Sequence, residues 1–183
     1  MPHIHQGTWS AKGKRFAIIA SRWNEFIADK LIEGALDALA KTGAVDSDIE
    51  IFRCPGAFEL TGIARRVADS GKFDALVALG VVIRGATPHF DVIVNQVTRG
   101  IAGIAAEAKL AVGFGVLTCD SIEQAIERSG SKGGNRGSDA TMAAIEMANL
   151  YAALDGDSTG EAPATASATN ATSATNAKKT PRK

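Results

Sequence analysis

The sequence has few cysteines and few aromatic residues, and it has no excess of charge of either sign. Its 183 residues include only two cysteines, Cys54 and Cys119, which are too few for a disulfide framework. We expect both thiols to be small buried side chains, with a catalytic thiol as the minority alternative. No segment resembles a secretory signal, so a reducing cytoplasm is the expected location.

The charge balance excludes several classes of partner. Twenty basic and twenty acidic residues give a formal net charge of zero, so no overall field attracts nucleic acid or an anionic membrane. The apolar run at 75–83 is too short to span a bilayer. No cluster of Asp, His and Cys implies a metal site. We therefore expect no nucleic-acid, membrane or metal partner.

Hydrophobic residues make up 45% of the chain, and they alternate between strand and helix patterns. This order predicts an α/β fold, a flavodoxin-like three-layer α-β-α sandwich with right-handed crossovers around a four-stranded parallel sheet. The predicted strands are 15–20, 48–52, 75–83 and 111–118. The predicted helices follow Asn24 and begin again at Ala57, and the later ones cover 91–110, 122–129 and 139–154.

The composition changes at both ends of the chain. Residues 1–14 are polar and irregular, and we expect an N-terminal arm before a single domain at 15–154. Residues 155–183 contain no Val, Ile, Leu, Met or aromatic side chain, and the sequence Ser-Ala-Thr-Asn occurs there twice. Because this segment has almost nothing to bury, we expect a disordered low-complexity tail.

The predicted strand at 75–83 is the centre of the sheet, because it has no polar face. Arg84 and a Gly-Ala-Thr-Pro turn follow it and place His89 at the carboxyl end of this strand. Ligands bind at that edge in open α/β sheets. A histidine can move protons near neutral pH, so His89 is a candidate acid-base group.

Polar and aromatic side chains also follow the other predicted strands. Trp23 offers a stacking face, and Asn24 either caps the next helix or binds a ligand. Glu59 has two interpretations, stabilisation of a helix N-terminus or contact with a substrate. Amides at 85–87, with the cations Arg128 and Arg136, suit a phosphate. The residues alone indicate an enzyme that acts on a phosphorylated small molecule and a planar polar one.

The glycine-rich segment at 130–137 matches no nucleotide-binding motif. It lacks the Gly-Lys-Ser/Thr of a Walker A loop. Elsewhere, Gly113 and Gly115 lack the third glycine that a dinucleotide-binding fingerprint requires. A flexible solvated loop is the alternative for the cations of the segment at 130–137.

Five motifs occur in a characteristic order: Pro-Gly-Ala-Phe-Glu at 55–59, Gly-Val-Val-Ile-Arg-Gly-Ala-Thr-Pro-His-Phe-Asp at 80–91, Phe-Gly-Val-Leu-Thr at 114–118, Glu-Gln-Ala-Ile-Glu-Arg at 123–128 and Gly-Asn-Arg-Gly at 134–137. Over residues 14–154 the chain resembles the lumazine synthase family. The resemblance implies a transferase of the penultimate step of riboflavin biosynthesis. Without a cofactor, it would condense 5-amino-6-(D-ribitylamino)uracil with 3,4-dihydroxy-2-butanone 4-phosphate to 6,7-dimethyl-8-ribityllumazine, phosphate and water.

The resemblance also implies a role for each candidate residue. His89 would be catalytic and transfer protons. Phosphate would bind at Gly85, Ala86, Thr87 and Arg128. The ribitylaminouracil would bind at Trp23, Asn24, Ala57, Phe58, Glu59, Val81, Val82, Ile83, Phe114 and Arg136, with Phe114, Arg128 and Arg136 coming from a neighbouring subunit.

Two residues depart from the common pattern of the family. Trp23 stands where Phe is common, which keeps a stacking face, and Arg136 stands where Lys is common, which keeps the charge but changes its shape. The family forms homo-oligomeric pentamers, and the short loop at 130–137 favours the 60-subunit icosahedral shell. Riboflavin synthase is a further expected partner. The alternative function is a non-catalytic flavin or lumazine binder, or a purely structural shell protein, on the same fold.

Overall fold

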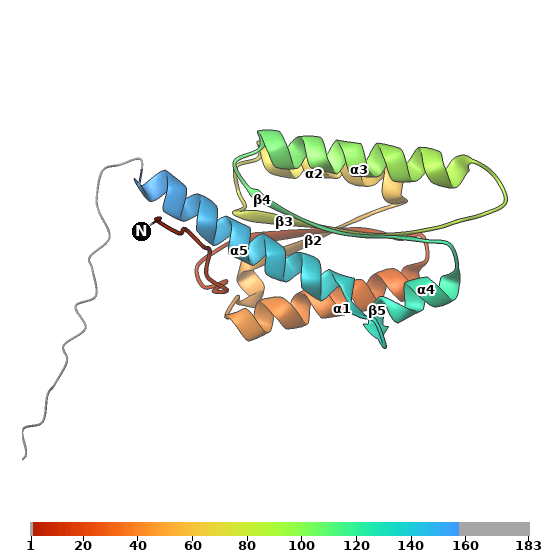
Figure 1. Ribbon diagram of the computed structural model, residues 1–183, viewed down its shortest axis with the longest axis horizontal. Helices are drawn as coiled ribbons and strands as arrows, with labels where there is room; N and C mark the ends of the chain where they lie inside the picture. Colours follow the sequence, from red (N-terminus) through yellow and green to blue (C-terminus); the bar gives the residue numbers. More distant parts are fainter. Residues whose placement is uncertain (1, 158–183) are drawn as a thin grey trace, which may run out of the picture.

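The computed structural model describes residues 2–157 (Figure 1). The predicted tail at 155–183 lies outside these residues except for 155–157, where the prediction is wrong, because these residues continue the last helix. The elements are β1 (Phe16–Ser21), α1 (Glu25–Thr42), a 3-10 turn (Asp46–Asp48), β2 (Ile49–Cys54), α2 (Ala57–Asp69), β3 (Ala75–Ile83), α3 (His89–Glu107), β4 (Ala111–Cys119), α4 (Ile122–Glu127), β5 (Ser129–Ser131), β6 (Gly134–Asn135) and α5 (Arg136–Asp157).

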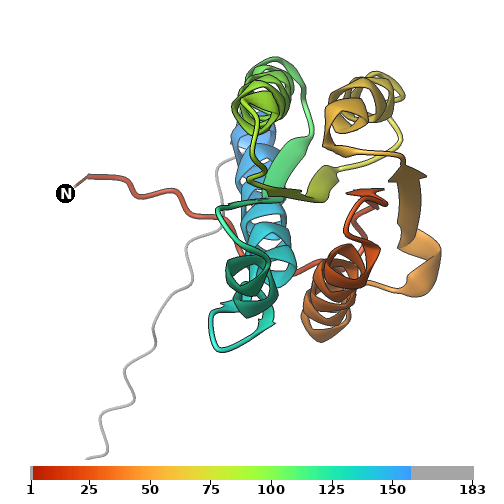
Figure 2. The same cartoon turned by 90° about the vertical axis from the view of Figure 1, so that its right-hand side faces the viewer.

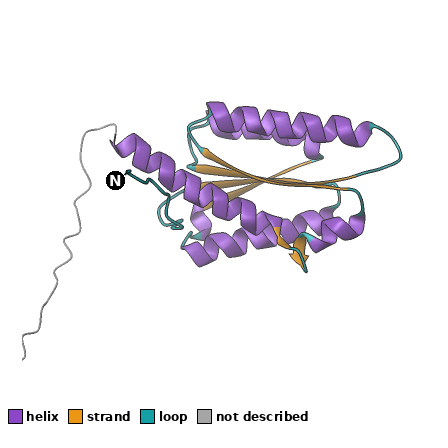
Figure 3. Cartoon of the chain, in the orientation of Figure 1, coloured by secondary structure: helices purple, strands orange, loops and turns teal. Residues whose placement is uncertain are grey.

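Four parallel strands form the central sheet in the order β2-β1-β3-β4. Helices α2 and α3 cover one face, and α1, α4 and α5 lie on the other (Figures 1 and 3). The predicted α/β three-layer sandwich with a four-stranded parallel sheet is therefore confirmed. Within residues 2–157, no helix has the length and apolar character needed to cross a membrane.

Alternate residues of the central strands supply two separate cores. Ile18 and Val77 pack with α1 and α5, whereas Ile19 and Ala78 pack with α2 and α3. All four side chains are fully buried. Burial on both faces explains why β1 and β3 contain almost no polar residues, since neither face of these two strands meets water.

The four strands end at one edge of the sheet, at Ser21, Cys54, Ile83 and Cys119. Figure 2 views the molecule from this side, with the loop that joins β3 to α3 in front. The chain leaves β1 towards α1 on one face and leaves β2 towards α2 on the other. The strand order therefore reverses direction between β1 and β3, which is where a parallel sheet opens to a ligand.

Three local predictions need correction. Helix α5 begins at Arg136 rather than 139, because the Asn135 side chain accepts hydrogen bonds from the amides of Gly137 and Ser138. The segment at 130–137 is not a loop throughout, since β5 and β6 pair there as a short antiparallel hairpin. Helix α3 covers His89–Glu107 rather than 91–110, so His89 lies on its first turn.

The packing of α5 on β4 depends on Gly113. A Cβ atom at this position would clash with the carbonyl oxygen of Ala140 in α5. We expect Gly113→Ala to lower the free energy of unfolding by about 1–3 kcal/mol, because the helix must move away from the sheet. Urea denaturation measures this change, with Gly62→Ala as the control, since no heavy atom lies within 4 Å of its added carbon. An unchanged midpoint for Gly113→Ala would contradict this packing.

Candidate functional site

The loops that follow β1 and β2 are joined by two backbone hydrogen bonds at the carboxyl edge. The amide of Arg22 donates to the carbonyl of Cys54 at 2.9 Å, and the amide of Trp23 donates to that of Pro55 at 3.2 Å. The Trp23 side chain is 72% exposed beside Gly56. A large indole without cover offers a planar ligand a surface for stacking.

Asn24 is placed by its backbone and not by a capping bond. It has a left-handed conformation, with φ at 58°, and its side chain accepts no hydrogen bond from the first turn of α1. The prediction of a side-chain cap is therefore wrong. The side-chain amide instead donates to the carbonyl of Val81 in β3 at 3.5 Å. Asn24 thus lies beside the end of the central strand.

Glu59 has the helix-stabilising role that was one of its two interpretations. One oxygen of its carboxylate, Oε2, accepts a hydrogen bond of 2.9 Å from the amide of Gly56, directly before α2, and so satisfies a backbone donor at the start of this helix. The same oxygen and the edge of the Trp23 ring both lie within 4 Å of the point that a Cβ atom of residue 56 would occupy. The structure therefore brings Trp23 and Glu59 together.

The loop after β3 is open to solvent. Residues 84–89 are all exposed, and within the described residues the amides of Gly85, Ala86 and Thr87 donate no hydrogen bond. Such free amides suit an anion. His89 is the first residue of α3 and is likewise exposed. Val81 is buried, whereas Val82 and Ile83 are half-buried at the end of the strand.

A groove of about 600 Å³ lies between α2 and α3. Phe58 lines it from α2 and is exposed, whereas Ala57, one residue earlier, is buried against the sheet. The groove also contains the cation Arg99 of α3. It extends the exposed surface of the carboxyl edge along the outer helices.

Phe114 lies apart from the residues above, whereas Arg128 and Arg136 contact residues in their own part of the chain. Phe114 lies in the middle of β4 opposite Ala78, five residues before the end of the strand, and this separates it from Ile83 by roughly 16 Å. Arg136 forms an ion pair of 2.8 Å with Asp139 on α5. Arg128 follows α4, where its Nη1 donates to the carbonyl of Gln124.

Both cysteines are buried and unpaired, as expected. Burial raises the pKa of the Cys54 thiol, and the charge of Glu59 adds to this effect. Burial likewise raises the pKa of Cys119, against the opposing effect of Arg128. Protonated thiols are poor nucleophiles, so neither cysteine is a candidate catalytic group. Residues 2–157 contain no group of His, Cys, Asp and Glu side chains suited to a metal ion.

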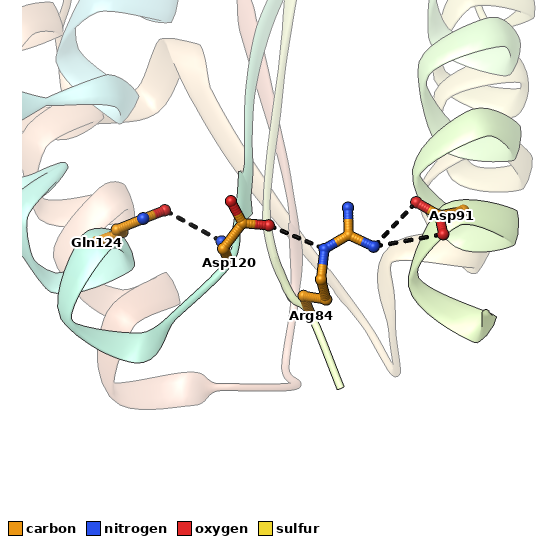
Figure 4. A network of polar contacts seen from close by, with 4 residues as sticks. All are labelled: Arg84, Asp91, Asp120 and Gln124. Carbon is orange, nitrogen blue, oxygen red and sulfur yellow. Dashed lines mark hydrogen bonds and ion pairs between the residues drawn. The ribbon is translucent and has the colours of Figure 1, made fainter. Parts of the chain in front are cut away.

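The sequence interpretation missed Arg84, which joins two carboxylates at this edge. Its Nε donates to Asp120 at 2.9 Å, and its Nη1 donates to Asp91 at 3.2 Å (Figure 4). The sequence did carry one indication of this role, the position of the residues: Arg84 follows the central strand directly, and Asp120 follows β4 directly. Its partners lie 7 and 36 residues away, so the pairing itself could not be read from the sequence.

These features define a class of protein: an α/β protein whose candidate ligand site lies at the carboxyl edge of a parallel sheet and has an exposed aromatic side chain, a carboxylate, free amides and a histidine. A family model described as 6,7-dimethyl-8-ribityllumazine synthase matches residues 13–152. The chain therefore belongs to the 6,7-dimethyl-8-ribityllumazine synthase family.

Individual relatives agree with this assignment over nearly their whole length. A protein named 6,7-dimethyl-8-ribityllumazine synthase from Desulfotalea psychrophila is 58% identical over 84% of this chain and 99% of its own length. Proteins with the same name from Chlorobium phaeobacteroides and Chlorobaculum tepidum are 58% and 54% identical over 80% and 81% of this chain. The matching regions span 94% and 96% of the lengths of these two relatives, respectively.

Proposed function

We propose that the chain condenses 5-amino-6-(D-ribitylamino)uracil with 3,4-dihydroxy-2-butanone 4-phosphate to give 6,7-dimethyl-8-ribityllumazine, phosphate and water. The membership of the family supports this reaction. The observation that carries it is the convergence of Trp23, Glu59 and the loop before His89 at one edge of the sheet. A carbonyl condensation of this kind needs acid-base groups and close positioning of two reactants.

The pyrimidine substrate fits the surface around the ends of β1, β2 and β3. Trp23 stacks on the planar ring, and the backbone of 81–83 reads its polar edge. Asn24 and Glu59 bind the hydroxyls of the ribityl chain. Support comes from the contact between Asn24 and Val81 and from the second carboxylate oxygen of Glu59, which accepts no hydrogen bond within residues 2–157.

The phosphate of the second substrate binds the free amides of 85–87 together with Arg128. His89 then transfers protons as the amine of the uracil attacks the ketone and forms an imine with loss of one water. Phosphate leaves by elimination, and ring closure with loss of a second water completes the product. The exposed position of His89 on the first turn of α3, directly after this loop, supports its place beside the leaving group.

Arg128→Ala is expected to raise the KM for the butanone phosphate by about 10-fold or more, because a charge-assisted contact to the phosphate is lost. The KM for ribitylaminouracil should change little, since that substrate carries no phosphate. Steady-state kinetics with each substrate varied in turn measures both values. Arg66→Ala, which removes another exposed arginine, is the control. An unchanged KM for the phosphate substrate would remove Arg128 from the site.

Phe114, Arg128 and Arg136 complete the site of a neighbouring subunit, so the active form is a homo-oligomer. Support comes from Phe114, whose ring is 43% exposed on the edge strand β4 and too far from Ile83 to serve its own chain. The residues at 15–154 are the synthase domain, with 1–14 as an arm and 155–183 as a tail, and the span of the family model supports these limits. The two reduced, buried thiols suit a cytoplasmic location.

We expect pentamers assembled into a 60-subunit shell, with riboflavin synthase as a further partner, because it consumes the product. The short connection between α4 and α5, closed by the β5–β6 hairpin, supports the shell. Native mass spectrometry should show the mass of sixty chains. Pentamers alone would contradict the shell and leave the shared site intact.

A further inference from the structure

Arg84 occupies the junction between the sheet and the loop that follows β3. Its amide donates to the carbonyl of Cys119 at 2.9 Å and so extends the pairing of β3 with β4 by one residue. Its guanidinium lies over the Phe90 ring, with Cζ 4.1 Å from the ring centroid. Because Phe90 is buried, this stacking fixes the direction of the guanidinium.

The contacts of this side chain continue in both directions (Figure 4). On one side Nη1 binds both oxygens of Asp91, on the first turn of the helix that His89 begins. On the other side Nε binds Asp120, whose amide donates to Oε1 of Gln124 at 3.1 Å. The carbonyl of Gln124 in turn accepts from Nη1 of Arg128 at 3.2 Å. One side chain therefore connects the start of α3 with the cation that follows α4.

These ion pairs are exposed, with 44% of the Arg84 side chain and 57% and 70% of the two carboxylates accessible. Pairs of this kind contribute little to the stability of a fold. The hydrogen bond that Nε donates to Asp120 nevertheless raises the pKa of Arg84 above its ordinary value, so the side chain remains charged. Its bonds to the two carboxylates leave from different nitrogens of one rigid plane, which a lysine ammonium cannot reproduce. The network is therefore better suited to holding geometry than to adding stability.

We infer that Arg84 is a positioning residue for the phosphate substrate: by bridging Asp91 and Asp120 it holds the loop at 85–87 and the helix that bears Arg128 in fixed places. This inference rests on the proposed function. It also connects two sites, since the loop serves the site of its own chain whereas Arg128 serves that of the neighbour. Without Arg84, the two carboxylates would stand uncompensated beside the phosphate loop.

The test compares Arg84→Lys and Arg84→Gln with the wild type in the full-length protein. Both variants are expected to raise the KM for the butanone phosphate by about 10-fold, because small displacements of a binding group are costly, with the KM for ribitylaminouracil and the melting temperature nearly unchanged. Inorganic phosphate, used as a competitive inhibitor, should bind more weakly by a similar factor. Arg65→Lys and Arg65→Gln are matched controls, because Arg65 has similar exposure and also pairs with two carboxylates, Asp69 and Glu107. Neither control should change the kinetics.

Three results would overturn the inference. The first is an unchanged KM for the phosphate substrate in both Arg84 variants while Arg128→Ala raises it, which would leave the proposed function standing. The second is wild-type kinetics for Arg84→Lys alone, which would show that charge and not the bridge matters. The third is an equal rise of both KM values, which would indicate general distortion. A wild-type protein that forms no product would overturn the proposed function and, with it, this inference.

Discussion

Replacing His89 with alanine is expected to lower kcat by about 100-fold or more, because a group that transfers protons acts mainly in the transition state. The KM values for both substrates should change little, since His89 is exposed and supports neither the stacking surface nor the free amides of the loop. Steady-state kinetics at saturating concentrations of both substrates measures the loss.

The control for this variant is His3→Ala, which removes another exposed histidine from the N-terminal arm. Its kcat should equal that of the wild type. Equal loss of affinity for both substrates in His89→Ala, with turnover of bound substrate intact, would show that His89 binds and does not move protons.

Mixing two impaired variants, with butanone phosphate well below its KM, is expected to raise activity above that of either variant alone, because the site is proposed to lie between two chains. His89→Ala damages the side of the site that includes the loop after β3, and Arg128→Ala damages the side offered to the neighbour. In a closed ring of randomly mixed subunits, about a quarter of the junctions combine an intact His89 with an intact Arg128. Turnover of refolded equimolar mixtures should therefore reach about a quarter of the wild-type value.

The matched control for mixing uses two defects on the same side of the site. His89 and Glu59 both lie on the side contributed by one chain, so His89→Ala mixed with Glu59→Ala should recover nothing. Recovery in this control, or none in the mixture with Arg128→Ala, would contradict a site shared between subunits. Because each variant is compared with its own unmixed sample, incomplete refolding does not imitate the result.

The sequence predicted the central strand to the residue, because burial on both faces leaves a run without polar side chains from Ala75 to Ile83. Prediction was weaker where side chains and not periodicity set a boundary. Helix α5 starts at Arg136 since Asn135 caps it, and that capping residue was visible in the sequence but was interpreted as part of a glycine-rich loop. Helix α4 is capped by Ser121, whose side chain accepts a hydrogen bond from the amide of Gln124.

The candidate site was predictable as a set of chain positions but not as a set of contacts. Strand ends in a parallel sheet share an edge, so Trp23, Glu59 and His89 could be grouped from their places alone. The bond from Asn24 to Val81 joins segments 57 residues apart, and no local pattern encodes it. The bridge made by Arg84 was missed for the same reason, because its meaning depends on where Asp91 and Asp120 lie in space.

The proposed reaction is tested most directly by mixing the purified protein with 5-amino-6-(D-ribitylamino)uracil and 3,4-dihydroxy-2-butanone 4-phosphate, following lumazine fluorescence and phosphate release together. Both signals should rise at equal molar rates, well above the uncatalysed reaction, and His89→Ala should abolish most of the increase. A wild-type sample that forms no lumazine above the uncatalysed background would contradict the proposed reaction.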